Sequence, residues 1–426
     1  MVKNIKKIYP RYFEEFKCIG GKCEDSCCIG WNIDIDKITF KKYFKVKDPE
    51  MKRMFQKNVQ NNERCSSEDI DYGIVKLKKD KRCPFLDEEN YCVIHSNLGE
   101  DYLSNVCTCF PRVTNKIDDT YEMSLDVACP EAARLILLNK EGIKFVSKEE
   151  SIGKHIISAQ IDSKIKEVQN SPLRYFREIR DFCIDIIQNR DFKLNERLYI
   201  LGDFINKLED KFNSNLGDIA KFISTYDIKR AAKEYSSDDI NSLLGNDNMN
   251  YIIQMNFFIK MLKILKVDKE VESITFKKYT KEMLEGYKIE SDKSINENAL
   301  LYIKAFDEYE EIIENEYNYI FENYLVNFIY NNMFPFNEVL TPFDSYIMLL
   351  MRVAFIKFYL VGLYLNGEDN NKEKIVGFIQ VFSKTIFMLL STSLQPTCFI
   401  STINVFYRYI IREPKQKKEN NCFPFS

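Results

Sequence analysis

The sequence predicts a mainly α protein in which a small cysteine-rich α+β N-terminal domain, residues 1–146, is packed on a large α-helical domain, residues 147–426. Three observations support this expectation. Ten of the 13 cysteines stand at or before Cys129. Short segments of alternating apolar and polar residues, typical of half-buried strands, are confined to the same part. From about residue 147, long segments carry apolar residues at the three- and four-residue spacing of amphipathic helices.

The expected elements of the first domain are short. Residues 31–36 alternate between apolar and polar side chains and predict a strand. Residues 38–57 show helical spacing, and residues 74–77 predict a second short strand. A third strand is expected at residues 121–127, where alternation returns. Pro130 then opens a helix at the first-turn position, where a missing amide hydrogen costs nothing.

The second domain is expected to contain about ten helices, given usual helix lengths. The clearest segments are residues 175–187, 194–212, 251–265, 299–329, 346–365 and 375–390. Residues 346–365 are long enough to cross a bilayer, which takes about 20 apolar residues. Arg352 and Lys357 lie inside this segment and would be costly at the bilayer centre. We therefore expect a mostly buried helix of a soluble domain, packed against residues 375–390.

Composition excludes several classes of protein. The 61 basic and 64 acidic residues give a net charge of -3, which argues against a general nucleic-acid binder. Residues 1–11 carry lysines but no following apolar run, so no secretory signal is expected. A cytoplasmic location and no membrane partner follow as expectations. In a reducing cytoplasm clustered cysteines indicate a metal, an iron–sulfur cluster or redox chemistry rather than disulfides.

The cysteines form a constellation that packing alone does not explain. It starts with the run C-I-G-G-K-C-E-D-S-C-C at residues 18–28 and continues through Cys83, Cys92, Cys107 and Cys129. His95, three residues after Cys92, is a weaker ligand candidate, because such a histidine is more often exposed or hydrogen-bonded to a ligand. Four cysteines outside the group are expected to be inert thiols: Cys65, Cys183, Cys398 and Cys422.

The spacing leaves the metal open. All-sulfur ligation suits zinc or an iron–sulfur cluster. Zinc sites usually show two tight cysteine pairs, and only Cys23 with Cys27 forms one here. Four thiolates gathered from separate loops fit a four-iron cluster at least as well. The radical S-adenosylmethionine pattern C-x3-C-x2-C is not met, because Gly30 stands at its third position.

Six blocks follow one another between about residues 12 and 139, a third of the chain: C-I-G-G-K-C-E-D-S-C-C-I-G-W, R-C-P-F-L-D, Y-C-V-I-H, Y-L-S-N-V-C, F-P-R and C-P-E-A-A-R-L. In number and order these blocks resemble the flagellin lysine-N-methylase family. A wider resemblance exists to small cysteine-cluster domains described as zinc- or iron-chelating.

This resemblance implies an enzyme that transfers methyl groups from S-adenosylmethionine to lysine ε-amines of flagellin and requires a 4Fe-4S cluster. The matching metal-site cysteines are Cys18, Cys23, Cys27, Cys28, Cys83, Cys92, Cys107 and Cys129. More thiols match than one cluster needs, so the four preferred ligands are Cys23, Cys27, Cys83 and Cys107. Cys109 is an extra thiol of this sequence.

No glycine-rich loop of the usual nucleotide-binding kind marks a donor site. The candidate donor-binding residues are Trp31, Arg112 and Arg134, each close to a cysteine block. Acidic neighbours are more often a solvated face than a site; they are Asp34, Asp36 and Glu131. The general base cannot be named from the sequence.

The alternative function is a non-catalytic zinc- or iron-binding protein for metal handling or sensing. Pure metal handling does not need a helical domain of about 280 residues, which favours the enzyme.

Overall fold

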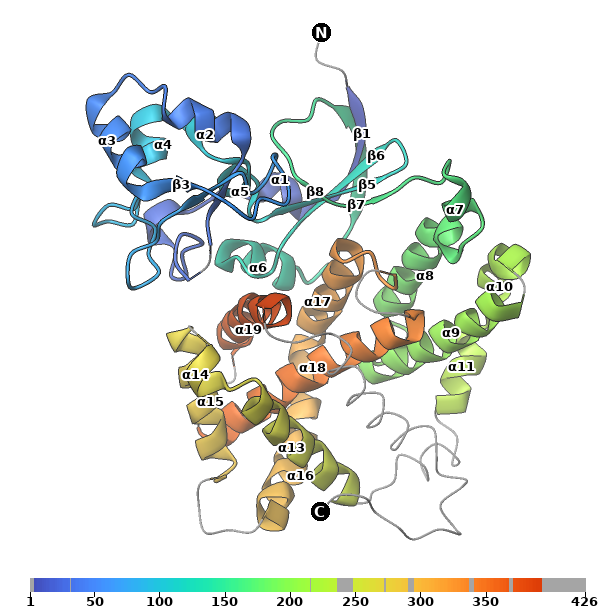
Figure 1. Cartoon of the computed structure of the whole chain (residues 1–426). Coiled ribbons are helices and arrows are strands. Elements are labelled where there is room, and N and C mark those ends of the chain that lie inside the picture. Colours follow the sequence, from blue (N-terminus) through green and yellow to red (C-terminus); the bar gives the residue numbers. More distant parts are fainter. Residues whose placement is uncertain are drawn as a thin grey trace. The chain divides into compact units, whose positions relative to one another are not determined.

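The computed structural model describes residues 4–30, 32–214, 216–235, 248–271, 273–289, 295–336, 341–367 and 371–392. The chain divides into two compact units, Met1–Lys166 and Glu167–Ser426 (Figure 1). Among the described residues, strands occur only in the first unit, and helices form the second. The expectation of a mainly α protein with a small mixed N-terminal part is confirmed.

The first unit is built on a five-stranded sheet with the order β7-β1-β6-β5-β8. Neighbouring strands are parallel for β1–β6 and β5–β8, and antiparallel for the other two pairs. The strands are β1 (Ile5–Pro10), β5 (Arg112–Ile117), β6 (Thr120–Leu125), β7 (Phe145–Glu150) and β8 (Ile157–Ile161). The unit continues past the boundary expected at residue 146 because β7 pairs along all of β1 and β8 pairs with β5.

A second sheet of three antiparallel strands has the order β2-β4-β3. Its strands are β2 (Asp34–Ile35), β4 (Gly73–Val75) and β3 (Val59–Asn61). The helices of this unit are α1 (Tyr12–Glu15), α2 (Lys37–Tyr43), α3 (Pro49–Asn58), α4 (Val93–Leu98), α5 (Asn105–Cys109) and α6 (Pro130–Leu137). Figure 1 shows α2, α3 and α4 gathered beside β3.

Two helices replace the single helix expected over residues 38–57. The carboxylate of Asp48 accepts a hydrogen bond from the amide of Met51 (2.8 Å) and caps α3. Pro49 occupies the first position of α3, where proline is favoured but where it cannot continue a preceding helix. The first helix, α2, therefore ends at Tyr43, and a second helix, α3, begins at Pro49.

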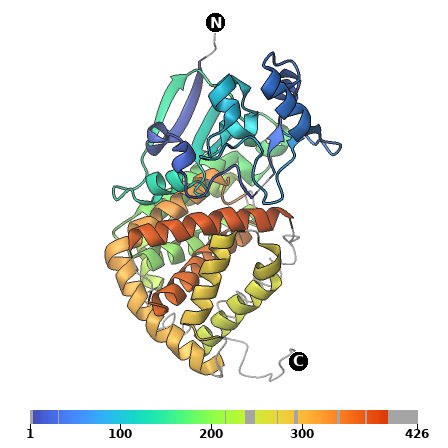
Figure 2. The same cartoon turned by 90° about the vertical axis from the view of Figure 1, so that its left-hand side faces the viewer.

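The second unit consists of helices α7 (Lys166–Gln169, at the junction), α8 (Phe176–Gln188), α9 (Leu194–Ser214), α10 (Ile219–Thr225), α11 (Ile228–Tyr235), α13 (Asn248–Ile264), α14 (Val267–Glu270), α15 (Ile274–Gly286), α16 (Ile295–Ile312), α17 (Asn318–Asn331), α18 (Pro342–Leu365) and α19 (Lys372–Thr392). A π-helical turn, Ile313–Tyr317, joins α16 to α17. Figure 2 shows α19, in red, crossing the end of α15, and these two helices are in contact.

The central helix of this unit is α18, which contacts α9, α15, α16 and α19. It is long and apolar enough to cross a membrane, yet 78% of its most apolar window is buried inside the protein. Lys357 on α18 forms an ion pair with Glu310, and the Arg352 guanidinium lies 4.9 Å from the ring centre of Phe328. The prediction of a mostly buried helix that packs against residues 375–390 is confirmed.

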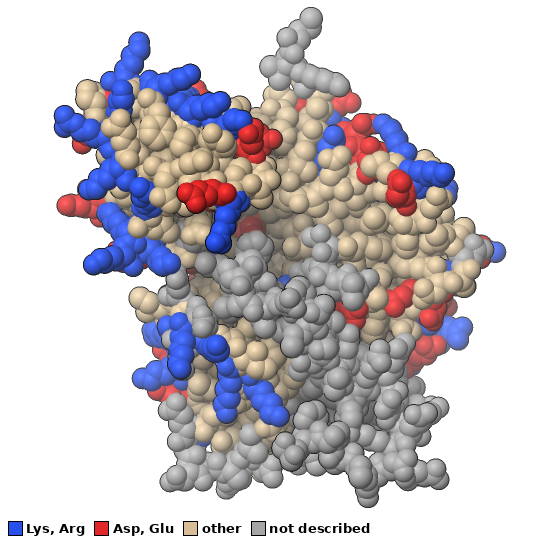
Figure 3. Space-filling view, viewed as in Figure 1, with Lys and Arg blue, Asp and Glu red and all other residues tan. Residues whose placement is uncertain are grey.

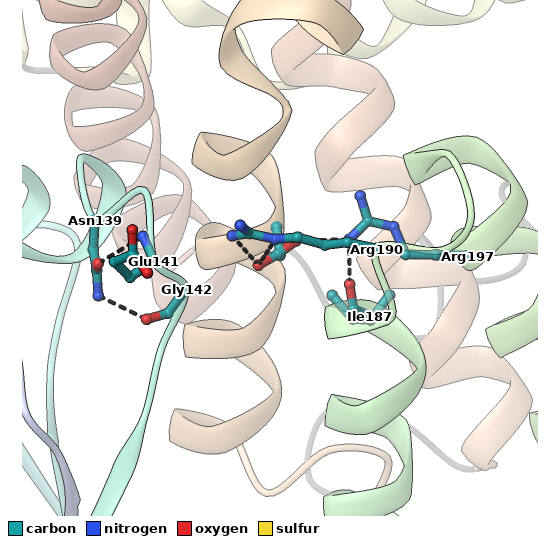
Figure 4. Close-up of polar contacts among 7 residues, drawn as sticks. Asn139, Glu141, Gly142, Ile187, Arg190 and Arg197 are labelled. Atoms are coloured by element: carbon teal, nitrogen blue, oxygen red, sulfur yellow. Dashed lines mark hydrogen bonds and ion pairs between the residues drawn. The ribbon is translucent and has the colours of Figure 1, made fainter.

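An ion triad around one buried carboxylate also holds the second unit together. The carboxylate of Glu322 on α17 accepts hydrogen bonds from Arg197 (2.7 Å) on α9 and from Arg190 (2.8 Å). Arg197 also donates to the backbone carbonyl of Ile187 at the end of α8 (2.6 Å) (Figure 4). The α8–α9 hairpin and α17, which are more than 100 positions apart in the sequence, are therefore joined at one carboxylate.

Candidate metal centre

The first cysteine loop depends on two glycines. Gly20 has a φ of 58°, a left-handed conformation that glycine adopts without strain. A Cβ atom on Gly21 would lie 2.4 Å from the backbone oxygen of Glu89 and 2.9 Å from the ring of Tyr91. Only glycine therefore lets this loop approach the turn that precedes Cys92.

Backbone hydrogen bonds pair the first cysteine loop with the segment around Cys83. The amide of Cys83 donates to the carbonyl of Cys28 (2.9 Å), and the amide of Gly30 donates to the carbonyl of Lys81 (3.2 Å). Two cysteine blocks more than 50 positions apart are thus brought together by main-chain pairing.

Cys92 stands at the N-cap of α4, opposite Leu86 in an antiparallel bridge. The amides of Ile94 and His95 donate to its thiol, which limits the rise in its pKa caused mainly by loss of hydration. The His95 residue is exposed. Its contribution in this structure is the backbone amide, so the idea that its imidazole is a ligand gains no support.

Capping interactions position Cys107 on α5. Ser104 caps the helix by accepting a hydrogen bond from the amide of Cys107 (3.3 Å). The buried carboxylate of Asp36 accepts from the amides of Asn105 (3.0 Å) and Thr39 (2.9 Å), so one side chain joins α2 to α5. Asp36 is therefore a buried cap rather than part of a solvated face.

Cys129 lies at the N-cap of α6. Burial raises the pKa of its thiol to about 12, although the amides of Glu131 and Ala132 donate to it and oppose this rise. The thiols of Cys23 and Cys27 add electrostatic repulsion. A residue about 100 positions from the first loop thus lies near it.

One thiol, that of Cys27, acts electrostatically on five others. Loss of hydration is the main cause of the raised pKa of five other thiols, and repulsion from Cys27 raises each of them further: Cys23, Cys83, Cys92, Cys107 and Cys129. Because such repulsion weakens with distance, the five side chains each lie near Cys27. We refer to these five residues and Cys27 as the cysteine set.

Two thiols of the set besides that of Cys129 are especially hard to ionise. The pKa of Cys83 and that of Cys107 both rise to about 12, chiefly through loss of hydration. The Cys107 residue is exposed to solvent, yet the protein around its sulfur atom hinders hydration of the thiolate. A bound cation would favour the thiolates that burial and mutual repulsion now disfavour.

The donor chemistry of the set fits a thiophilic metal or an iron–sulfur cluster. Within the described residues, no three His, Cys, Asp or Glu side chains already stand in a geometry that could hold a metal ion. The four preferred ligands all belong to the set. Of the other two matched cysteines, Cys18 is exposed, and Cys28 contacts the set through its backbone carbonyl, which accepts the hydrogen bond from the amide of Cys83.

The remaining cysteines lie apart from this pattern. Cys109 is buried at the end of α5, and Cys183 is buried in α8 of the second unit. Cys65 is exposed, with its sulfur 3.6 Å from a carboxylate oxygen of Asp71. Two more, Cys398 and Cys422, lie outside the described residues.

The donor-binding candidates have different surroundings. Trp31 lies outside the described residues. The Arg112 guanidinium stands 5.2 Å from the ring centre of Phe16, and its charge lowers the otherwise raised pKa of Cys109. Arg134 pairs with Glu24 (2.6 Å) of the first cysteine loop and with Glu131 (2.9 Å) on its own helix.

Arg134 also lines a cavity of about 420 Å³ within the first unit. Four charged residues share the lining: Arg11, Glu15, Glu141 and Lys144. Asn139 shapes one edge, because its side chain donates to the carbonyl of Gly142 (2.8 Å) and accepts from the amide of Glu141 (3.1 Å) (Figure 4). Through the Arg134–Glu24 pair, the cavity wall is joined to the cysteine loop.

Sequence reasoning did not identify Glu24 or these four charged residues. The position of Glu24 inside the first cysteine run could have identified it as a site residue. Arg11, Glu15, Glu141 and Lys144 carry no local motif, and only the contact between α1, α6 and the chain before β7 gathers them.

Comparison with known proteins decides the family. A model of the FliB lysine N-methylase C-terminal domain matches residues 180–388. The lysine-N-methylase of Salmonella choleraesuis (strain SC-B67) is 24% identical over 368 residues, 84% of this chain and 85% of that protein. The flagellar biosynthetic protein FliU of Salmonella muenchen is 34% identical over 157 residues, 37% of this chain and 90% of FliU. The chain belongs to the flagellin lysine-N-methylase family.

A further family member, the lysine-N-methylase of Salmonella typhimurium (strain LT2), is 23% identical over 362 residues, 84% of this chain and 85% of that protein. No solved structure matches the chain. The family resemblance read from the cysteine blocks is confirmed, and the match to the C-terminal family domain falls entirely within the second unit.

Proposed function

We propose that this chain is a cytoplasmic protein-lysine N-methyltransferase that transfers methyl groups from S-adenosylmethionine to flagellin, with a 4Fe-4S cluster held by the cysteine set. Two relatives are named lysine-N-methylases and a third a flagellar biosynthetic protein. The observation that carries the proposal is that five thiols, four of them from segments distant in the sequence, lie near Cys27.

The set would hold the cluster with four of these thiols; Cys23, Cys27, Cys83 and Cys107 are our choice. A cluster with an open iron site would supply a place where the amino and carboxylate groups of the donor can bind. The peptide amides that already donate to Cys92 and Cys129 would also stabilise the thiolate forms.

The cavity beside Arg134 is our candidate site for the donor. Beyond the amino and carboxylate groups that the cluster would bind, S-adenosylmethionine carries a sulfonium cation, which a carboxylate can stabilise, and nucleoside groups that can hydrogen-bond with charged side chains of either sign. Arg11 and Lys144 supply cations, and Glu15 and Glu141 supply carboxylates. In the described part of the chain these four side chains form no hydrogen bond or ion pair of their own.

Methyl transfer requires a neutral lysine, although the usual pKa of its amine is about 10.4. In the reaction the carbon–sulfur bond of the donor breaks, a carbon–nitrogen bond forms, and the amine loses its proton to a base or to water. Removal of the lysine from water lowers its pKa and favours the reactive neutral form.

The test combines metal analysis, donor binding and methylation of purified flagellin by anaerobically purified protein. Wild-type protein should contain iron and acid-labile sulfide, bind S-adenosylhomocysteine in calorimetry and methylate flagellin. A Cys83→Ser variant should lose iron and methyl transfer, because it removes a buried member of the set. The matched control is Cys65→Ser, an exposed thiol in the same unit, which should keep all three properties.

A colourless, zinc-loaded wild-type protein without methyl transfer would support the alternative metal-binding protein. Iron-loaded protein that leaves flagellin unmodified would contradict the proposed reaction. Unchanged donor binding in cluster-free Cys83→Ser protein would contradict a role of the cluster in holding the donor.

A further inference from the structure

The first unit carries a strongly basic stretch in a chain that is otherwise acidic. Residues 37–82 contain 14 Lys or Arg and 7 Asp or Glu, a net charge of +7. Because the whole chain has a net charge of -3, the remaining residues together carry -10. The charge is therefore separated along the sequence.

The structure places this stretch on α2, α3 and the loop that follows β4. Figure 3 shows basic side chains, in blue, gathered over this part of the first unit, with few acidic ones between them. Nine of these side chains belong to exposed residues and form no hydrogen bond or ion pair within the described part of the chain: Lys41, Lys45, Lys47, Lys52, Arg53, Lys57, Lys76, Lys78 and Lys79. We call these nine residues the basic surface.

Other cations of the same stretch do have partners. Lys37 pairs with Glu68, and Lys42 donates to the backbone oxygen of Asp101 (2.8 Å). The basic surface contains only cations of this stretch that have no such partner. Neighbouring cations without counter-charges repel one another and raise the free energy of the folded unit, and an anionic partner would remove that repulsion.

The basic surface and two members of the cysteine set, Cys83 and Cys92, rest on one hydrophobic core. Tyr43 of α2 and Met51 and Phe55 of α3 are buried in the same cluster as Cys83, and Cys92 packs against it. The rings of Tyr43 and Phe55 stack with centres 3.9 Å apart. A partner bound to the basic surface would therefore be held at a defined position relative to the thiols.

We propose that the basic surface docks an acidic face of the protein substrate whose lysine is methylated. This rests on the proposed function, because it assumes a protein substrate. Eight of the nine cations are lysines, which act as point charges suited to dispersed carboxylates, whereas bidentate phosphate recognition favours arginine. The acidic remainder of the chain also disfavours a long polyanion such as nucleic acid.

The experiment compares a triple charge reversal on the basic surface with a matched triple reversal elsewhere. The test variant is Lys41→Glu, Lys45→Glu and Lys52→Glu. The control is Lys221→Glu, Lys229→Glu and Lys263→Glu, three exposed and unpaired lysines of the second unit. Both variants change the net charge equally.

Steady-state methylation of flagellin is measured at several salt concentrations, together with iron content and methylation of a short uncharged lysine peptide. The test variant should raise KM for flagellin about tenfold at low salt. Its kcat, iron content and activity on the peptide should stay near those of the wild type. The salt dependence of kcat/KM should become shallower, because fewer charges attract the substrate. The control variant should behave as the wild type.

An unchanged KM for flagellin in the test variant would overturn the docking surface while leaving the methyltransferase proposal intact. Absence of methylation by the wild type would instead count against the proposed function. The docking surface would then be tested by measuring the binding of flagellin directly, and equal affinity of the test and control variants for flagellin would overturn it. Tight binding of wild type to duplex DNA or to anionic vesicles at physiological salt, lost in the test variant, would assign the surface to those partners instead.

Discussion

At the residue scale, the second unit depends on one buried carboxylate. The side chains of Glu322 and Arg197 are each only 1% exposed, whereas that of Arg190 is 47% exposed. Removing one partner of a buried ion pair leaves the other charge without compensation in a poorly hydrated site. Exposed pairs contribute far less, because water already solvates both ions.

We therefore expect Glu322→Gln to lower the free energy of unfolding of the second unit by about 3–5 kcal/mol. Glutamine keeps the shape of the side chain but leaves the charge of Arg197 unpaired. Chemical denaturation followed by circular dichroism measures the change. Arg190→Ala is the comparison, with an expected loss of at most about 1 kcal/mol. Equal losses in the two variants would show that burial of the pair is unimportant.

At the element scale, α15 and α18 approach each other through glycine. A Cβ atom on Gly286 would lie 2.0 Å from the backbone oxygen of Gly362, and one on Gly362 would lie 2.5 Å from the side chain and 3.0 Å from the backbone oxygen of Met283. Backbone atoms cannot move aside as a flexible side chain can. The contact of α18 with α15 thus requires small residues at both positions.

Gly286→Ala should destabilise the second unit by about 1–3 kcal/mol, because the added methyl group forces the two helices apart. The control is Gly377→Ala on α19, where the nearest atom to an added Cβ is the hydroxyl of Tyr279 at 3.8 Å. That change should be neutral, or stabilising by up to about 1 kcal/mol, since alanine favours helix. Thermal denaturation of both variants decides the point; a neutral Gly286→Ala would refute the close approach.

At the scale of the whole molecule, the chain joins a small cysteine-rich unit to a larger helical one. The cysteine set draws on positions from Cys23 to Cys129, so a bound metal centre would cross-link most of the first unit. The second unit has a separate apolar core and only one cysteine among its described residues, the buried Cys183.

If the cysteine set holds a metal centre as proposed, its removal by a chelator under reducing conditions should lower the melting temperature of the first unit by several degrees, as expected for a loss of a few kcal/mol. The transition of the second unit should stay in place. Differential scanning calorimetry of the full chain before and after chelation measures both, with Cys83→Ser expected to resemble chelated wild type. A joint shift of the two transitions would contradict this division.

Several features were predictable from the sequence because their signals are local. Helical periodicity identified the long helices, and two charges within residues 346–365 correctly indicated a buried helix, α18. The order of the cysteine blocks identified the family. These signals lie within about 20 residues of sequence, or depend on residue identity alone.

Other features had no local signal because they depend on distant partners. The strand β1, I-K-K-I-Y-P, shows no strict alternation and becomes a strand by pairing with β6 and β7. The resemblance yielded eight matching cysteines, and the four preferred among them were chosen without any knowledge of where each thiol lies. The tertiary structure decided that Cys27 lies near five other thiols, because the pairing of Cys83 with Cys28 and the caps of α4, α5 and α6 determine where each thiol points.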